Sequence, residues 1–158
     1  MKITRLSGSE WERLKHIRLA ALQDAPVAFG STLEAAQGWV DDVWRQQAED
    51  LPTFIARIDG IDVGIARGMS NGSNSDAYLI SMWVSPTERG KRVGEQLVEA
   101  VMKWARDAGF SRLLLDVADN NAAAIAFYER LDFQPTGDTG VYPPARSFIT
   151  EHRRARML

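Results

Sequence analysis

The chain has 158 residues, of which 45% are hydrophobic and 25% charged, with no cysteine and a formal net charge of −2. This length suits one domain, and the average composition disfavours disorder. The lack of cysteine excludes disulfides, thiolate nucleophiles and cysteine-based metal sites, and the isolated His16 and His152 make a poor metal site. The net charge disfavours nucleic acid, the apolar runs are too short to cross a bilayer, and the first residues lack a signal-peptide core. We therefore expect one cytoplasmic domain over residues 1–158, with no metal and no nucleic-acid or membrane partner.

The first half of the chain predicts a short edge strand and a helix, followed by an antiparallel meander. Residues 1–6 have a strand pattern, residues 9–24 a helical period capped by Ser9, and residues 24–36 break that pattern. Acidic residues at 41–42 favour a second helix over 41–49. Residues 52–70 predict two strands joined by a hairpin turn at Asp59 and Gly60, and residues 77–84 predict a third.

The second half changes to a strand, helix, strand order. Apolar residues at helical spacing predict a helix over 93–108 that Gly109 ends, and an apolar run predicts a strand over 111–119. A further helix over 120–133 and two strands around a proline-rich loop complete the chain. A strand, helix, strand crossover normally joins parallel strands with a right-handed connection. The expected fold class is α/β with a mixed sheet, an antiparallel meander followed by a β-α-β crossover.

The stretch "VSPTERGKRVGEQL", residues 84–97, places cations where a strand gives way to a helix. Arg89, Lys91 and Arg92 lie at the positive end of the helix dipole, and each would destabilise the helix by about 0.3 to 1 kcal/mol. Residues that are unfavourable for local stability tend to mark functional sites. Unpaired N–H groups, the dipole and these cations would together receive a polyanion such as pyrophosphate. Gly90 and Gly94 would let the backbone approach it.

A purely structural interpretation of the same stretch stays open. In it, "SPTE" is a capping box with Ser85 at the cap and Pro86 at the first helical position, and the cations form a solvated face. The stretch lacks both the GK[ST] of a Walker loop and a G-x-G-x-x-G fingerprint.

Residues 82–137, about a third of the chain, resemble the GNAT superfamily of N-acetyltransferases. The family's Arg/Gln-x-x-Gly-x-Gly/Ala loop aligns with Arg89, Arg92 and Gly94, with Arg92 in place of the first glycine. The family's Asn-x-x-Ala-x-x-x-Tyr motif aligns with Asn121, Ala124 and Tyr128, and its usual Gly-Phe becomes residues 132–133, Asp-Phe. Two motifs at the family's spacing are much more specific than either one alone.

The resemblance implies acetyl-CoA as co-substrate and direct transfer, in which an amine attacks the thioester and the tetrahedral intermediate collapses to an amide and a thiolate. The family's central strands splay apart, and the pantetheine arm pairs with the first of them. The implied cofactor-binding residues are Met82, Trp83, Val84, Arg89, Gly90, Lys91, Arg92, Val93, Gly94, Glu95, Asn121, Ala124, Phe127 and Tyr128.

Two of these residues have structural alternatives. Tyr128 matches the family's general acid, but it shares an apolar stripe with Ala124 and Leu131 and would also suit a core tyrosine. Asn121 matches a residue that holds pantetheine, and it would also cap the helix.

The general base is less clearly marked. An alkyl amine with a pKa near 10.4 is about one part in a thousand neutral at pH 7, a handicap of about 4 kcal/mol. Residues 77–84 contain no carboxylate, where many members keep one. We take Glu34 as the catalytic base candidate, because residues 24–36 resemble an acceptor-side loop of bacterial members; Asp76 or a bound water is the alternative. The aromatic residues that would line the acceptor pocket, unless they are core, are Phe29, Trp39, Trp44 and Tyr142.

These observations together predict an acetyl-CoA-dependent enzyme that acetylates a primary amine of a small molecule. The alternatives are a protein N-terminal or lysine acetyltransferase, which differs only in its acceptor, and a CoA-binding sensor without catalysis. Because members of the family often pair through their last strands, and residues 147–158 are strand-like, we also expect a homodimer.

Overall fold

The computed structural model describes residues 1–158, except for the side chain of Ala145. Its middle layer is a seven-stranded mixed sheet with the order β1-β2-β3-β4-β5-β7-β6. The first four strands form the predicted antiparallel meander, and β4 and β5 are parallel, which confirms the expected fold class. The strands are β1 (Lys2–Arg5), β2 (Thr53–Ile58), β3 (Ile61–Ser70), β4 (Asp76–Val84), β5 (Arg112–Ala118), β6 (Gln134–Val141) and β7 (Thr150–Met157).

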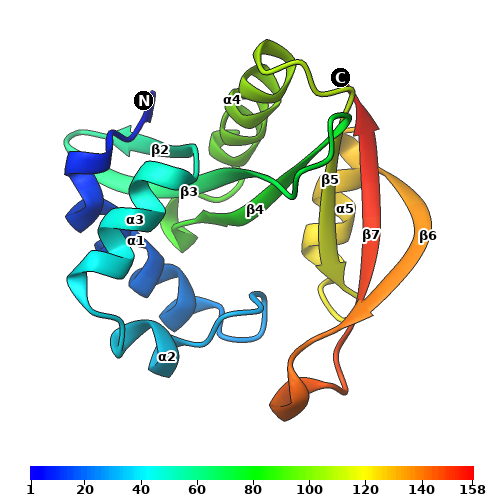
Figure 1. The fold of residues 1–158 in the computed structure, drawn as a ribbon, viewed down its shortest axis with the longest axis horizontal. Coiled ribbons are helices and arrows are strands. Elements are labelled where there is room, and N and C mark those ends of the chain that lie inside the picture. Colours follow the sequence, from blue (N-terminus) through cyan, green and yellow to red (C-terminus); the bar gives the residue numbers. More distant parts are fainter.

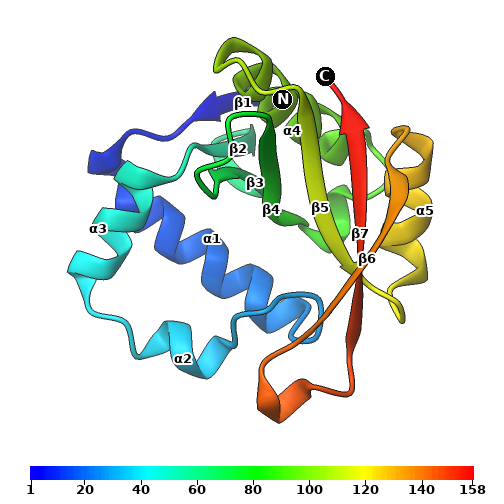
Figure 2. The ribbon, with the colours of Figure 1, turned by 45° about the vertical axis from the view of Figure 1, so that its right-hand side comes forward.

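Helices cover both faces of the sheet (Figures 1 and 2). The helices α1 (Trp11–Asp24), α2 (Leu33–Gln37) and α3 (Asp41–Asp50) pack on one face, around the buried Trp44, Ile55 and Ile65. The helices α4 (Val93–Asp107) and α5 (Ala122–Arg130) pack on the other. Within the described part of the chain, every helix is too short or too polar to cross a bilayer.

One local prediction near the N-terminus was wrong, and another, the break in helical pattern after Asp24, holds only up to Leu33. Ser9 does not cap the first helix, because a 3-10 turn over Gly8–Glu10 precedes α1 and begins after Ser7, whose N–H bonds the Glu10 carboxylate at 2.9 Å. Residues 24–36 are not irregular throughout, because α2 begins at Leu33. The hydroxyl of Thr32 caps it by accepting from the N–H of Ala35 at 3.2 Å.

The turn between β2 and β3 matches its prediction. Asp59 and Gly60 both have positive φ, 48° and 82°, as a two-residue turn between antiparallel strands requires. The pairing of Ile58 with Ile61 closes the hairpin directly around them.

The central strands β4 and β5 separate soon after they meet (Figure 1). Only residues 76–78 of β4 pair with residues 112–114 of β5. Further along β4, Ser81 has a φ of 56°, and two β4 residues oppose a single β3 residue between the pairs Arg67–Ile80 and Ile65–Trp83. Such a bulge bends a strand. The result is an opening between β4 and β5 in the middle of the sheet, as the resemblance implied.

Candidate active site

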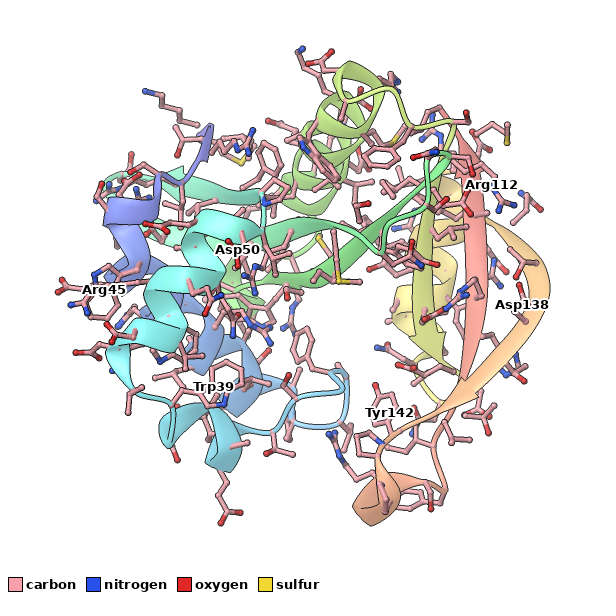
Figure 3. All side chains as sticks on the ribbon, in the orientation of Figure 1. Trp39, Arg45, Asp50, Arg112, Asp138 and Tyr142 are labelled. Carbon is pink, nitrogen blue, oxygen red and sulfur yellow. The ribbon has the colours of Figure 1, made fainter. Side chains whose placement is uncertain are left out.

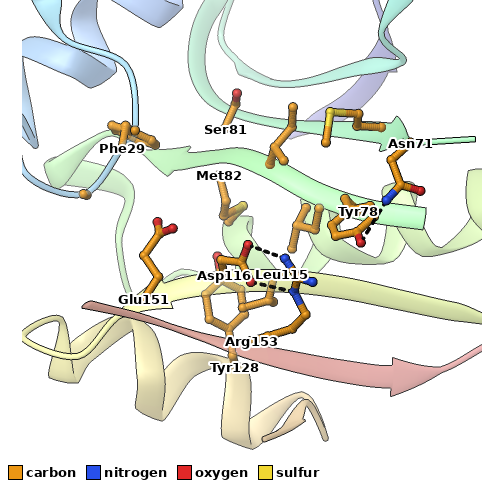
Figure 4. A pocket seen from close by; sticks show the side chains of 15 residues that line it. Phe29, Asn71, Tyr78, Ser81, Met82, Leu115, Asp116, Tyr128, Glu151 and Arg153 are labelled. Carbon is orange, nitrogen blue, oxygen red and sulfur yellow. Dashed lines mark hydrogen bonds and ion pairs between the residues drawn. The ribbon is translucent and has the colours of Figure 1, made fainter. Parts of the chain in front are cut away.

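Two pockets meet in the opening between β4 and β5. The first, here called the helix pocket, has a volume of about 470 Å³ and lies between residues 82–84, the segment 88–95 and α5. The second, the sheet pocket, has a volume of about 410 Å³ and is lined by β4, β5 and β7 (Figure 4). Both pockets share four wall residues, Ala28, Phe29, Met82 and Tyr128. A ligand in one pocket can therefore reach a ligand in the other at these side chains.

The segment before α4 presents its backbone N–H groups. The helix starts at Val93, so the interpretation of "SPTE" as its capping box was wrong; Pro86–Glu88 forms a separate 3-10 turn. Gly90 and Arg92 have positive φ, 77° and 64°. Within the described residues, no acceptor is found for the N–H groups of residues 89–95. Free N–H groups at the positive end of a helix suit an anion.

The three cations of this segment are each paired with an acid. Arg89 donates to the carboxylate of Asp24 and, through Nε, to the carbonyl of Val84 at 2.9 Å. The other pairs are exposed: Lys91 lies 3.3 Å from Glu88, and Arg92 lies 2.8 Å from Glu95. The backbone, rather than unpaired side-chain charge, is thus the free anion receptor here.

Asp24 connects this segment to α1 in the opposite layer, a role that sequence reasoning did not predict. Its carboxylate at the end of α1 accepts from Trp83 Nε1 at 2.9 Å as well as from Arg89. These two donors, Trp83 first, hold the pKa of Asp24 below its usual value. An acid at a helix C-terminus is unfavourable because it lies at the negative end of the helix dipole. The bonds from Trp83 and Arg89 offset this cost and account for an acid at the end of α1.

The walls of the helix pocket contain the predicted cofactor residues except Lys91. A Cβ on Gly94 would lie 3.0 Å from Met82 Cε and 3.1 Å from Phe127 Cζ, so a larger residue there would displace these side chains. Asn121 caps α5 by accepting from the N–H of Ala124 at 3.2 Å, as the alternative reading expected. Phe29, expected on the acceptor side, also lines this pocket, and the wall residues that sequence reasoning missed are Ala25, Ala28, Glu88, Ala123 and Arg130.

Tyr128 lies where the pockets meet, with 8% of its surface exposed. Its ring packs edge-on against Phe127 and Phe133, with centroids 5.2 and 5.8 Å away. Burial raises the pKa of the phenol above its usual value, so Tyr128 is protonated at neutral pH. Tyr128 is therefore both a core residue and a pocket residue, and its phenol can donate a hydrogen bond.

Charged groups line the sheet pocket on β5 and β7. Arg153 forms a two-pronged ion pair with Asp116, at 2.9 and 3.0 Å, and its guanidinium lies 5.4 Å from the centre of the Tyr78 ring. Glu151 stands two residues earlier on β7 and points into the pocket (Figure 4). Burial, first, and the nearby Asp116 raise the pKa of Glu151, while Arg153 and Arg146 lower it.

A set of hydrogen bonds, here called the clasp, ties the loop between β6 and β7 to the loop after α1, which lines both pockets. The loop between β6 and β7 approaches the loop that follows α1 (Figures 2 and 3). The Arg146 guanidinium donates to the carbonyls of Pro26, Phe29 and Gly30 at 3.2, 2.8 and 2.6 Å. The Tyr142 hydroxyl donates to the carbonyl of Val27 at 3.2 Å. These bonds fix the backbone that carries Ala28 and Phe29 into both pockets.

The structure does not bring most of the acceptor-side candidates to the pockets. Phe29 lines both pockets. Trp39 packs against the buried Trp44 in the cluster around α3, with ring centroids 5.0 Å apart and planes tilted by 58°, and Tyr142 serves in the clasp. Glu34 is exposed on α2, outside both pocket walls.

Asp76 is also absent from the walls of both pockets. Its carboxylate forms a two-pronged pair with Arg112, at 2.9 and 2.8 Å, which holds its pKa below the usual value and makes it a weak base. The pocket-lining acids that sequence reasoning missed are Glu88, Asp116 and Glu151.

Comparison with known proteins settles the family. The model of the Acetyltransferase (GNAT) family matches residues 11–133. The chain belongs to the GNAT family. This GNAT acetyltransferase is 30% identical over 135 residues to the IAA acetyltransferase of Azospirillum brasilense, covering 80% of the chain and 88% of the relative. It is also 30% identical over 97 residues to the aminoglycoside N(6')-acetyltransferase type 1 of Salmonella typhimurium, covering 57% and 67%.

Solved structures agree with the fold. The structure of yncA from Salmonella typhimurium was determined with its cofactor acetyl-CoA. It aligns with this chain at a TM-score of 0.80 and 18% identity, and the alignment covers 100% of this chain and 94% of yncA. The protein is accordingly an acyltransferase that uses acetyl-CoA as co-substrate.

Proposed function

We propose that this acetyltransferase transfers the acetyl group to a primary amine of a small molecule, with acetyl-CoA in the helix pocket and the amine in the sheet pocket. The observation that carries this proposal is the meeting of the two pockets at Tyr128 and Met82. The sheet pocket, at about 410 Å³, has the size usual for small-molecule sites. The clasp fixes the backbone of Phe29 and Gly30 in the wall of this pocket, and a pocket with fixed walls suits a compact acceptor. The aminoglycoside relative, which by its name acetylates a small amine, supports the same class.

The co-substrate would bring an activated acetyl group, and residues of the helix pocket would hold the co-substrate so that this group faces the amine. The free N–H groups of residues 89–95 suit the pyrophosphate. The backbone of Met82, Trp83 and Val84 lies along one side of the helix pocket and suits the pantetheine arm. The predicted residues on α5 form the opposite wall of the same pocket.

Tyr128 is proposed to donate a hydrogen bond to the departing sulfur. Even an unperturbed phenol, with a pKa near 10, is a weaker acid than a thiol near 8.5, and burial raises the pKa of Tyr128 further. Complete proton transfer to the thiolate would thus be uphill. Stabilisation of its charge by the O–H group is the contribution that the geometry supports.

The substitution Tyr128→Phe tests this role, because it removes one hydroxyl and keeps the ring. We expect single-turnover acetyl transfer at saturating acetyl-CoA to fall about 10²-fold, the lower part of the range for removing a positioned proton donor. The acceptor is found first by screening amines and peptides while detecting free CoA. Melting temperature controls for folding, and calorimetry with CoA controls for binding.

Two outcomes would count against the proposal. An unchanged rate in a folded Tyr128→Phe enzyme would return Tyr128 to a packing role. A wild-type protein that binds CoA and acetylates no amine would instead favour the CoA-binding sensor, and activity on peptides alone would favour a protein acceptor.

A further inference from the structure

We propose that Glu151 receives the acceptor's ammonium group and removes its proton, so that the acceptor is an alkyl amine that arrives as a cation. This inference rests on the proposed function, because it places the amine in the sheet pocket. It also supplies the base that β4 lacks, since residues 77–84 contain no carboxylate.

The position of Glu151 supports this role. Its side chain extends from β7 into the sheet pocket, on the side of the pocket where Met82 and Phe29 lie (Figure 4). Met82 and Phe29 are also walls of the helix pocket, so an amine held at Glu151 lies near the junction. Within the described part of the chain, the Glu151 carboxylate has no ion-pair or side-chain hydrogen-bond partner, whereas Asp116 is engaged by Arg153.

Among the described residues, Glu151 forms no direct ion pair, although two arginines lower its pKa from a distance. The groups that face it are Asp116 on β5, Arg153 on β7, Arg146 in the clasp and the Tyr142 phenol. Arg153 is occupied by Asp116, and Arg146 donates to three carbonyls of the loop after α1. The pocket therefore favours a cation. Burial raises the pKa of Glu151, which makes its carboxylate a stronger base than an exposed glutamate.

The step balances without a further reactant. One N–H proton of the ammonium moves to a Glu151 oxygen, and the freed nitrogen lone pair forms the amide bond to the acetyl carbon as its C–S bond breaks. The sulfur leaves with the electron pair of that bond and accepts a hydrogen bond from Tyr128. As the amide forms, the nitrogen loses a second N–H proton, which passes to the departing sulfur directly or through water. The products are the neutral amide, the CoA thiol and a protonated Glu151, which returns its proton to solvent.

Other acids of the chain are less suitable. Asp116 is already in a two-pronged pair, and an ion-paired carboxylate is a weaker base. Glu34 is exposed and outside the pocket walls, which makes Glu34→Gln a matched control for Glu151→Gln. Both substitutions remove one negative charge and keep the shape of the side chain.

The experiment compares the two variants on two kinds of acceptor. With the best alkyl amine from the screen, Glu151→Gln should lower kcat/KM about 10²- to 10⁴-fold, and Glu34→Gln should have no effect. With a hydrazide or an aniline, which is neutral at pH 7, the loss from Glu151→Gln should be less than tenfold, because no proton has to be removed before attack. Glu151→Asp should recover part of the alkyl-amine activity. The KM for acetyl-CoA should be unchanged in all three variants.

A second measurement needs no acceptor activity. In protein labelled with ¹³C at the glutamate carboxyl carbon, the signal absent from Glu151→Gln belongs to Glu151. We expect this signal to titrate above the value of an ordinary glutamate, near 4.3. We expect it to shift on addition of 1,4-diaminobutane and to stay in place on addition of 1,4-butanediol.

These measurements separate the inference from the function on which it rests. A wild type without activity on any amine would reject the proposed function, while the carboxyl titration would still decide whether Glu151 is a cation receptor. Equal losses on alkyl amines and hydrazides would reject the base, and so would full activity of Glu151→Gln. A Glu151 signal that titrates normally and ignores the diamine would reject the cation receptor.

Discussion

Replacement of Arg146 by alanine should release the loop after α1 from the loop between β6 and β7 and leave the sheet intact. The substitution removes all three guanidinium bonds to the carbonyls of Pro26, Phe29 and Gly30. It also removes a cation–π contact, because the Arg146 guanidinium lies 4.9 Å from the centre of the Tyr142 ring. The bond from the Tyr142 hydroxyl to Val27 would remain as a weaker link between the loops.

The magnitude follows from those bonds. Each is worth about 0.5 to 1.5 kcal/mol net, and two of the three are exposed to water, so a total near 2 kcal/mol is reasonable. A change of about 2 kcal/mol shifts the docking equilibrium of the loop about 30-fold. Because the clasp joins two surface loops, this free energy should appear as local opening rather than as global unfolding.

Hydrogen exchange followed by mass spectrometry is the appropriate assay. The Ala28 N–H, which donates to the Ala25 carbonyl at 3.1 Å, lies in the released loop and should exchange about 30-fold faster in Arg146→Ala. KM for the amine should rise more than KM for acetyl-CoA, because Gly30 lines only the sheet pocket. Arg146→Lys keeps the charge but cannot reach all three carbonyls, so it should give an intermediate increase in exchange rate. Tyr142→Phe removes one hydrogen bond and should give a smaller increase.

Two results would contradict this reasoning. Unchanged exchange over residues 25–31 would mean that the clasp does not hold the loop. Faster exchange throughout β5 and β7 would mean that Arg146 stabilises the sheet instead of one loop.

Two further predictions concern the helix pocket. Gly94→Leu should abolish CoA binding measured by calorimetry while the protein stays folded, because its side chain would enter the space that Phe127 fills; retained affinity would move the cofactor elsewhere. Asp24→Asn should weaken CoA binding by freeing Arg89, and it should reduce the loss of thermal stability in acid. The sign follows from the lowered pKa of Asp24: its ionised form adds stability above the unfolded pKa near 3.8, and this stability is lost as pH falls through the lower folded pKa. Melting temperatures of the two proteins that fall in parallel from pH 6 to 2.5 would contradict this.

The elements with strong local patterns could be predicted from the sequence. The apolar spacing of α4 and the Asp59–Gly60 turn depend on neighbours in the chain, and both were confirmed. The walls of the helix pocket were also anticipated, since most of them come from two short segments with fixed spacing. Lys91 is the exception: its side chain pairs with Glu88, and Glu88 rather than Lys91 lines the pocket.

The acceptor side could not be predicted in the same way. Phe29 was expected there, but Glu151 and the clasp come from distant parts of the chain, and Arg146 meets its carbonyl partners across about 116 to 120 residues. No local period marks such contacts. The bulge at Ser81 has no sequence signal either, because a residue other than glycine takes the positive φ there.

The three cations in residues 84–97 are not the free anion receptor that their charge suggested, because each is paired with an acid. Three unpaired cations at the start of α4 would destabilise it, but Asp24, Glu88 and Glu95 each neutralise one of them. Arg92 even takes a left-handed conformation, φ 64°, that glycine adopts more easily. The N–H groups of residues 89–95 remain free, and they do not depend on which side chain each residue carries. This explains how a pyrophosphate site can tolerate arginine where the family has glycine: the backbone turn, and not the side chain, supplies the proposed contact.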